Sequence, residues 1–403
     1  MTRPSRSWWR WLRRMGEFDP WVWRARSLEK AGGVGVTRIR LGPFVTGIGM
    51  LLLALGCGQN DYAGLLPCEG VGEIEAHCGF TNPEDLVMAP GGRELIVSEM
   101  GVFMRDTPGE LSVFDLDTQS RKPLRVEWDS PAEDWGEAGC ARPEPALFSP
   151  HGIDLERRPD GRHALFVVNH GGRESVEVFE LGGEAGAWVL SWRGCARPPG
   201  TPMLNDVTAF PGGGFGVTHM WEKEASALSL ALAFVFDLDT GWVWLWDPET
   251  GFSKLPNSDA TAPNGIASTP DGLFLFVNHY VANRTVRVDR RTGEVVGEVE
   301  VQQPDNVTVD EDGQLWIAGH HHFVADTTCA EIEGACPLPF SVVRADGESM
   351  EGEVVFRHEG APMGFATVAL AVGDRLFMGS ATGDRMISIA LPSSRNATGA
   401  TGG

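Results

Sequence analysis

Five short polar segments recur along this 403-residue chain at the same position within a repeated pattern. They are Glu84-Asp85, His151, Asn205-Asp206, Asn264 and Asp305-Asn306. Each precedes a glycine-containing turn and an apolar run, and a sixth turn at Gly373-Asp374 follows residues 365–368, which carry no acid or amide. Repeats of roughly 40–70 residues, each made of several short strands, are typical of a β-propeller. Because the innermost strand of every blade starts at the central channel, the polar positions are expected to converge there.

Short runs of β-branched and aromatic residues predict an all-β fold, a six-bladed β-propeller. Examples are residues 164–168, 176–179, 233–236, 242–246 and 273–277. The 51 Gly and 26 Pro residues interrupt these runs frequently. Residues 222–232 have the one helical pattern that stands out. A β-sandwich is the competing fold, but it does not explain why polar segments recur at one phase.

Four segments are expected along the chain. Residues 1–56 form a leader and signal segment, residues 57–80 an N-terminal linker, residues 81–391 the propeller, and residues 392–403 a disordered tail. The leader is unusually long for a signal, and an over-extended start, with initiation near Val34 or Val36, would explain it.

The signal segment predicts export. Arg38 and Arg40 precede an uncharged, mostly apolar stretch, residues 41–56, which ends at Gly56-Cys57. A basic region, a short apolar region and a small residue before the cleavage site describe a secretory signal. A cysteine at this position resembles the bacterial lipoprotein signal and predicts lipidation of Cys57, hence anchoring in the periplasm or cell envelope. Ordinary secretion and an uncleaved anchor are the alternatives.

The charge of the chain limits its partners. The net charge is −22, and residues 1–56 contain ten Lys or Arg against three acids. The remaining residues therefore carry 23 basic and 52 acidic side chains, a net charge of −29. Such a body repels nucleic acid and anionic membranes. The expected partner is a small molecule, with membrane contact only through the lipid anchor.

Six cysteines besides Cys57 fit three disulfide bridges in an exported protein. Cys329 and Cys336 close a short loop and form the first expected pair, which leaves Cys68–Cys78 and Cys140–Cys195 by elimination. None of these cysteines has a histidine at metal-binding spacing, so a zinc site is not expected.

The polar segments have the composition of a calcium site. Carboxylates supply charge and amide carbonyls supply neutral oxygen ligands, the mixture that calcium prefers. The first set of expected ligands is Glu84, Asn205, Asn264, Asp305 and Asn306. Asp85 and Asp206 are each adjacent to one of these residues and point the opposite way on an extended strand. With the main-chain carbonyl of Ile153, they are expected to hold a second calcium ion deeper in the channel.

Two histidines are candidates for proton transfer. His151 lies at the channel end of the second repeat, and His170 follows one strand later. A hairpin would bring them together at the mouth of the channel. A neutral imidazole oriented by a second one can take a proton from water near pH 7.

At these motifs the chain resembles the paraoxonase/arylesterase family, calcium-dependent lactonases with a six-bladed propeller. The matching stretches are residues 83–86, 149–153, 167–170, 204–207, 264–266 with 269–272, 305–307, and 315–316 with His320. The resemblance implies the same two calcium sites and the His151–His170 dyad. It also implies that His320 and His219 line the substrate pocket.

The chain also departs from that family. Family members join an early cysteine to one at the extreme C-terminus, whereas residues 386–391 contain no cysteine. Ring closure must therefore depend on hydrogen bonding or on a different N-terminal arrangement.

The function expected is calcium-dependent hydrolysis of lactones and aryl esters, in which calcium polarises the carbonyl and the histidine dyad activates water. A gluconolactonase/regucalcin-type propeller enzyme, which uses one divalent ion, is the first alternative. A non-catalytic propeller binding module is the second.

Overall fold

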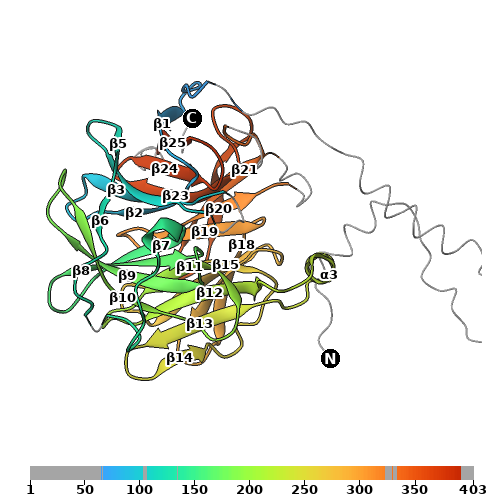
Figure 1. Ribbon diagram of the computed structural model, residues 1–403. Coiled ribbons are helices and arrows are strands. Elements are labelled where there is room, and N and C mark those ends of the chain that lie inside the picture. The colour runs from blue at the N-terminus through green and yellow to red at the C-terminus, as the bar shows by residue number, and fades with distance from the viewer. Residues whose placement is uncertain are drawn as a thin grey trace, which may run out of the picture. The chain divides into compact units, whose positions relative to one another are not determined.

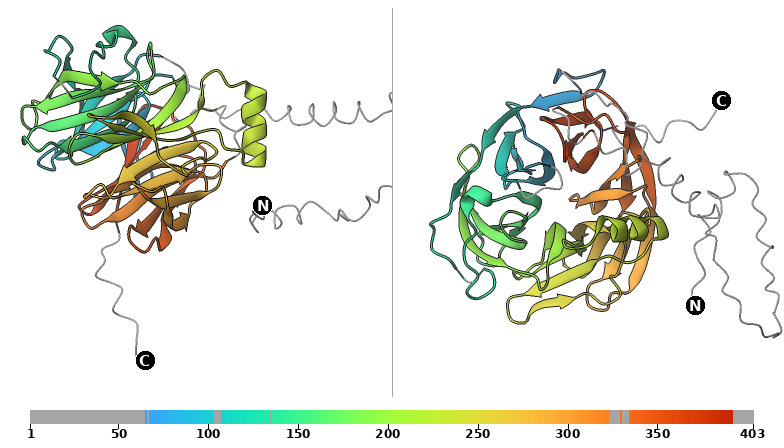
Figure 2. Two further views of the ribbon diagram at one scale, coloured as in Figure 1. Left: turned by 90° about the horizontal axis from the view of Figure 1, so that it is seen from below. Right: turned by 45° about the vertical axis from the view of Figure 1, so that its right-hand side comes forward.

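The computed structural model describes residues 65, 67–102, 107–133, 135–322, 329 and 334–391. The predicted leader, Cys57 and the predicted tail lie outside the described residues, so the expectations about them remain predictions. The described part forms six β-sheets arranged in a ring (Figures 1 and 2). The prediction of an all-β, six-bladed propeller is therefore confirmed.

Each blade is a sheet whose first four strands run antiparallel to their neighbours. Blade 1 consists of β2 (Pro83–Met88), β3 (Glu94–Glu99), β4 (Glu110–Asp115) and β5 (Ser120–Pro123). Blade 2 consists of β7 (Pro150–Arg157), β8 (His163–Asn169), β9 (Ser175–Gly182) and β10 (Val189–Ala196), with β6 (Arg125–Glu127) parallel to β10 at its edge. Blade 3 consists of β11 (Pro202–Ala209), β12 (Phe215–Glu222), β13 (Trp242–Asp247) and β14 (Gly251–Lys254).

The other three blades repeat this order. Blade 4 consists of β15 (Pro263–Ser268), β16 (Phe274–His279), β17 (Arg284–Asp289) and β18 (Val295–Glu300). Blade 5 consists of β19 (Pro304–Val309), β20 (Gln314–His320), β21 (Phe340–Asp346) and β22 (Gly352–His358). Blade 6 consists of β23 (Ala366–Val372), β24 (Arg375–Ser380), β25 (Arg385–Ala390) and β1 (Glu75–Cys78).

The innermost strands surround the axis. In chain order β2, β7, β11, β15, β19 and β23 each contact the next, and β23 contacts β2. Apolar side chains fill the space between neighbouring blades in six separate clusters. Between blades 6 and 1, for example, Leu86 and Phe114 pack with Val368 and Phe377. Burial of each such side chain stabilises the fold by about 1.5–3 kcal/mol, so the ring is held by contacts between blades rather than by one central core.

The N-terminal strand closes the ring. β1 lies within residues 57–80, the expected linker, and pairs antiparallel with β25, with Glu75 opposite Ser388 and Cys78 opposite Arg385. One blade is thus assembled from both ends of the described chain. This arrangement supplies the hydrogen-bonded closure that the missing C-terminal cysteine requires.

All three expected disulfides form, namely Cys68–Cys78, Cys140–Cys195 and Cys329–Cys336. Three bridges indicate a protein that matures in an oxidising environment. Within the residues that the structure describes, no helix is long and apolar enough to cross a membrane.

One strand prediction was wrong. Residues 233–236 belong to the helix α3 (Ala227–Phe236), which begins five residues after the start of the helical pattern predicted for residues 222–232. Ser226 caps the helix by accepting a hydrogen bond from the Ser229 backbone N–H at 3.1 Å. The alanine- and leucine-rich turn that follows favours helix, and a short apolar run cannot by itself distinguish helix from strand. A 3-10 turn, η2 (Pro145–Leu147), precedes β7.

Candidate metal and catalytic site

The polar segments lie where the innermost strands begin. In every blade the register between the innermost strand and its neighbour shifts at this point. Such irregularities re-aim side chains and are frequent beside active sites. Glu84 and Asp85 are both buried, and their charges interact. Their side chains have different partners, because Glu84 accepts from Asn306 and Asp85 accepts from the Ile153 N–H. That the two adjacent ligands point to opposite sides stays a prediction.

Four residues of the first predicted ligand set contact or interact with one another, whereas no described contact joins the fifth, Asn205, to them. The Asn306 side-chain N–H donates to Glu84 Oε1 at 2.8 Å, across blades 5 and 1. Asn264 hydrogen-bonds the Asp305 carboxylate. The five side chains of this set are between 1% and 7% exposed. Residues separated by more than 200 positions thus meet in one buried cluster.

Four buried oxygens of the predicted ligand set have no hydrogen-bond partner among the described residues. They are Glu84 Oε2, Asn205 Oδ1, Asn264 Oδ1 and Asn306 Oδ1. An unsatisfied buried acceptor costs about 1–3 kcal/mol, so four from different strands indicate a ligand. Carboxylate and amide oxygens are hard donors that suit calcium. No three His, Cys, Asp or Glu side chains of the described residues form a metal-binding cluster, because amides supply most of these donors.

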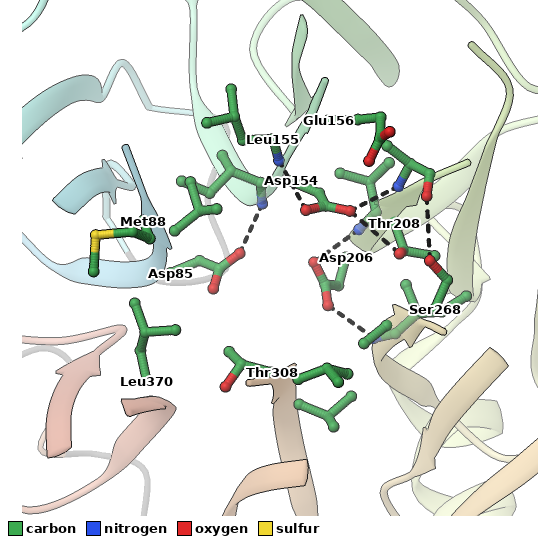
Figure 3. A pocket seen from close by; sticks show the side chains of 18 of the residues that line it. Asp85, Met88, Asp154, Leu155, Glu156, Asp206, Thr208, Ser268, Thr308 and Leu370 are labelled. Carbon is green, nitrogen blue, oxygen red and sulfur yellow. Dashed lines mark hydrogen bonds between the residues drawn. The ribbon is translucent and has the colours of Figure 1, made fainter. Parts of the chain in front are cut away.

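A second group of acids, Asp85 and Asp206, lies in a cavity among the innermost strands (Figure 3). Asp85 and Asp206 line a cavity of about 350 Å³ that extends along the innermost strands of the blades. The Ile153 backbone N–H donates to Asp85 Oδ2 at 2.7 Å, and the Ile266 N–H donates to Asp206 Oδ2 at 2.8 Å. Ile153 therefore lies beside Asp85, but its amide rather than its carbonyl makes the observed contact.

Crowded negative charge marks both groups. Burial, followed by the charge of Glu84, raises the pKa of Asp85 and of Asp305 well above the ordinary value. Burial and the charge of Asp85 do the same to the pKa of Asp206. Each carboxylate is thus costly to ionise in the absence of a cation, and a bound divalent ion would remove that cost.

The two predicted histidines form a pair. His151 Nδ1 lies 2.6 Å from His170 Nε2, and the rings meet edge to face with centroids 4.9 Å apart. His151 Nε2 lies 3.4 Å from Glu84 Oε1. Burial lowers the pKa of His151, but the Glu84, Asp305 and Asp85 carboxylates together outweigh burial and raise this pKa above its ordinary value. The pair thus connects the first ligand set to the strand connection after β8.

The two predicted pocket histidines differ. His320 Nε2 donates to the Ala366 carbonyl at 2.9 Å, and Nδ1 lies 3.1 Å from the hydroxyl of Tyr280. His320 Nε2 is also 3.4 Å from Asp305 Oδ2, and burial lowers the pKa of His320 to about 3. His320 is therefore a neutral neighbour of the first ligand set.

His219 has other surroundings. Its ring packs edge-on against Trp242 with centroids 4.3 Å apart, and Nε2 lies 3.7 Å from Glu222 Oε1. Neither ring nitrogen has a hydrogen-bond partner among the described residues. No described contact joins His219 to the ligand cluster, so its pocket role remains a prediction.

Two glycines permit the close approach of ligand strands. A Cβ on Gly152 would lie 2.5 Å from the Asp206 Cα and 2.8 Å from the Asn205 carbonyl oxygen. A Cβ on Gly265 would lie 2.6 Å from the Asn306 Cα. The glycines follow His151 and Asn264 directly, and this repeated position was the sequence signal that could have identified them.

Sequence analysis missed Glu174, Lys223 and Tyr280. Glu174 contacts His170, and Lys223 contacts Glu174. No repeat marks these residues, because they lie in connections between strands rather than on the innermost strands. Only the fold shows that they adjoin the site.

A closed ring of blades around a buried cluster of acids, amides and paired imidazoles defines a β-propeller with a polar channel. The model of the Arylesterase family matches residues 68–386, and the chain therefore belongs to this family. The resemblance stated above is confirmed, and membership supports a hydrolase that acts on a small molecule.

Comparisons with other proteins add remote similarities. No curated protein matches the chain. A gluconolactonase from Xanthomonas campestris is 16% identical, with 83% of this chain and 96% of that chain covered and a TM-score of 0.48. Regucalcin, a calcium-binding protein from Agrobacterium tumefaciens, is 15% identical, with 82% and 94% covered and a TM-score of 0.43. The family assignment comes from the family model alone.

Proposed function

We propose that this protein is a calcium-dependent hydrolase of lactones and aryl esters. One observation carries the proposal: four unsatisfied buried oxygens and a crowd of carboxylates lie beside a hydrogen-bonded histidine pair. The oxygens suit a divalent cation, and the imidazoles suit proton transfer near neutral pH. Membership of the Arylesterase family supports the same chemistry.

The proposed ligands of the catalytic ion are Glu84, Asn205, Asn264, Asp305 and Asn306. The proposed ligands of a structural ion are Asp85, Asp206 and the Ile153 carbonyl. When bound at the first set, calcium supplies Lewis-acid polarisation of the substrate carbonyl and compensates the negative charge that develops on its oxygen.

The chain's own groups handle the proton. His151 Nε2 accepts a proton from the attacking water, and His170 holds the other ring nitrogen of His151. The protonated pair then returns the proton to the oxygen of the leaving alcohol. His320, neutral through burial, keeps its position through Ala366 and Tyr280 and borders the ligand set without charging it.

The decisive test is hydrolysis of γ- and δ-lactones and phenyl acetate by the purified protein. Rates are measured in calcium, after EDTA and after calcium is restored. We expect turnover that disappears with EDTA and returns with calcium. A folded protein that binds calcium but is inactive on the whole panel would instead support the binding-module alternative.

Two variants separate the roles of metal and base. Asp305→Ala is expected to reduce the rate more than His151→Gln, because metal polarisation supplies several kcal/mol and acid–base help contributes roughly 10²–10⁴-fold. Equal and mild losses in both variants would contradict the assignment.

The number of ions distinguishes the proposal from a gluconolactonase/regucalcin-type enzyme with one ion. Elemental analysis of the purified protein is expected to give two calcium ions per chain. Asp206→Asn is expected to give one. A single ion in both proteins would favour the alternative enzyme class.

We also propose that the protein is exported and anchored through lipidated Cys57. The three disulfides support export. Mass spectrometry of the protein from its membrane fraction tests the anchor, and a mature chain without a lipid mass would favour ordinary secretion.

A further inference from the structure

A buried carboxylate lies at the far end of the histidine pair. Glu174 precedes β9 and its side chain is 7% exposed. Both of its carboxylate oxygens lie 3.0 Å from His170 Nδ1. Its Oε1 also lies 2.5 Å from the Lys223 ammonium nitrogen, and its Oε2 accepts from the Leu204 N–H at 3.2 Å. Blade 3 thus supplies two of the groups that hold Glu174.

A carboxylate can only accept hydrogen bonds, and this fixes the protons along the chain of contacts. His170 must carry its proton on Nδ1, which faces Glu174. His170 Nε2 is then an acceptor and requires the proton of His151 on Nδ1. The remaining nitrogen, His151 Nε2, then carries the lone pair of the neutral pair of rings. It lies 3.4 Å from Glu84 Oε1, an oxygen that accepts its short hydrogen bond, at 2.8 Å, from the Asn306 side chain instead.

We propose that Glu174, held by Lys223, is the positioning residue that sets the tautomers of both histidines and thereby leaves His151 Nε2 available as the base. The role of His151 as the base rests on the proposed hydrolase function. The position of the proton on His170 does not depend on that function. No proton moves to Glu174: when His151 accepts the proton of water, the carboxylate stabilises the positive charge shared by the two rings.

The charge state of Glu174 agrees with this role. Burial raises the pKa of Glu174, but the interactions with His170 and Lys223 outweigh burial and lower that pKa below the ordinary value. The side chain is therefore ionised at neutral pH, and an ionised acceptor orients an imidazole more strongly than a neutral one does.

The kinetic test uses Glu174→Gln, which keeps the size of the side chain. An amide can turn its NH₂ group toward His170 Nδ1 and stabilise the wrong tautomer. We expect kcat to fall about 10²-fold, in the range that proton transfer contributes, with KM and calcium affinity little changed. Glu180→Gln is the matched control. Glu180 lies on β9 and pairs with Arg193, so this substitution removes the same charge at a position away from the histidines.

A double variant separates positioning from general support of the fold. If Glu174 acts through the pair, adding Glu174→Gln to His170→Gln lowers kcat by less than about 3-fold, since groups that act as a unit are not additive. Losses that multiply, together with a lowered calcium affinity in Glu174→Gln, would show that Glu174 only supports β11 and would overturn the proposal.

Nitrogen NMR of ¹⁵N-histidine-labelled protein gives a readout that does not need activity. With His170→Gln used for assignment, the His170 Nδ1 is expected to carry the proton in the wild type and in Glu180→Gln, and to lose that preference in Glu174→Gln. A His170 protonated on Nε2 in the wild type overturns the inference. An inactive wild type with the expected tautomer overturns the hydrolase function and leaves the inference in place.

Discussion

At the scale of single residues, the channel contains buried carboxyl groups, and no lysine or arginine is among the groups that most strongly raise or lower their pKa values. Asp85, Asp206 and Asp305 are buried, and burial raises their pKa values most. The charge of Glu84 raises the pKa of Asp85 and Asp305 further, and the charge of Asp85 raises that of Asp206. A cation shared among the strands would stabilise these groups. At this scale, the site is defined by which atoms lack partners rather than by any single motif.

Gly152→Ala tests how closely the ligand strands must approach. The added Cβ would meet the backbone of Asp206, at 2.5 Å from its Cα, so β7 or β11 must shift. We expect calcium affinity to fall at least tenfold in isothermal titration, about 1.4 kcal/mol. Gly182→Ala is the control, because its Cβ would meet only the Val189 carbonyl oxygen at 3.9 Å. Equal affinity in both variants would show that the approach is unimportant.

The proposed ligands stand out in the sequence because several of them occupy the same place in a repeat. Glu84, Asn264 and Asp305 all follow a proline at the start of an innermost strand. Glu174 could not be predicted, since it is one of 55 acids and its contact with His170 depends on a loop conformation.

At the scale of the elements, the four-residue strand β1 completes blade 6 and thereby closes the ring. Arg385 on β25 is fully buried and donates to the carbonyl oxygens of Leu65 and Pro67, at 3.0 Å each. These contacts attach the segment before β1 to the last blade. Ring closure therefore combines strand pairing with a buried guanidinium.

Arg385→Met is expected to destabilise the protein by about 3 kcal/mol, because each carbonyl left without a donor costs about 1–3 kcal/mol. Urea unfolding measures the loss. Arg344→Met is the control: its guanidinium is 42% exposed and pairs with the exposed Glu353, so a change below about 1 kcal/mol is expected. Similar midpoints for the two variants would argue against a closing role.

His77 makes the same closure sensitive to acid. Its Nε2 lies 2.8 Å from Ser388 Oγ, and burial lowers the pKa of His77 to about 4. Between pH 6.5 and about 4 the unfolded chain takes up a proton that the folded chain refuses, so the free energy of unfolding falls as pH decreases through this window.

We expect His77→Gln to flatten the decrease in stability between pH 7 and pH 4.5 by about 2 kcal/mol, estimated from 1.36 kcal/mol for each unit of pKa. Thermal or urea unfolding across this range measures the difference. His279 and His320, with pKa values lowered to about 4 and about 3, remain in both proteins and contribute equally. Parallel pH profiles for the two proteins would contradict the assignment.

At the scale of the whole molecule, two kinds of contact join the innermost strands. Apolar clusters between blades include side chains of these strands, such as Leu86 and Val368, and polar contacts cross the channel. Asp85 links blade 1 to blade 2 through Ile153, and Asp206 links blade 3 to blade 4 through Ile266. A bound ion would connect all of these blades at once.

Calcium removal is therefore expected to lower the melting temperature. Saturation of one site at a hundred times its dissociation constant adds about 2.7 kcal/mol, which corresponds to a shift of roughly 5 °C for a domain of this size. Calorimetry in calcium and in EDTA measures the shift, and Asp206→Asn is expected to reduce it. An identical melting temperature in both buffers would show that calcium does not tie the blades together.

The sequence by itself determined the number of blades and the strand that carries each predicted ligand, because these follow from periodicity. The count of cysteines allowed three disulfides, and the pairing was decided by the structure. The tertiary structure alone decided how the ring closes, that residues 233–236 join a helix, and that Glu174 and Lys223 adjoin the histidine pair. Repeats are local and can be recognised along the chain. Contacts between blades join residues far apart in sequence, and their partners are selected only when the ring closes and buries them.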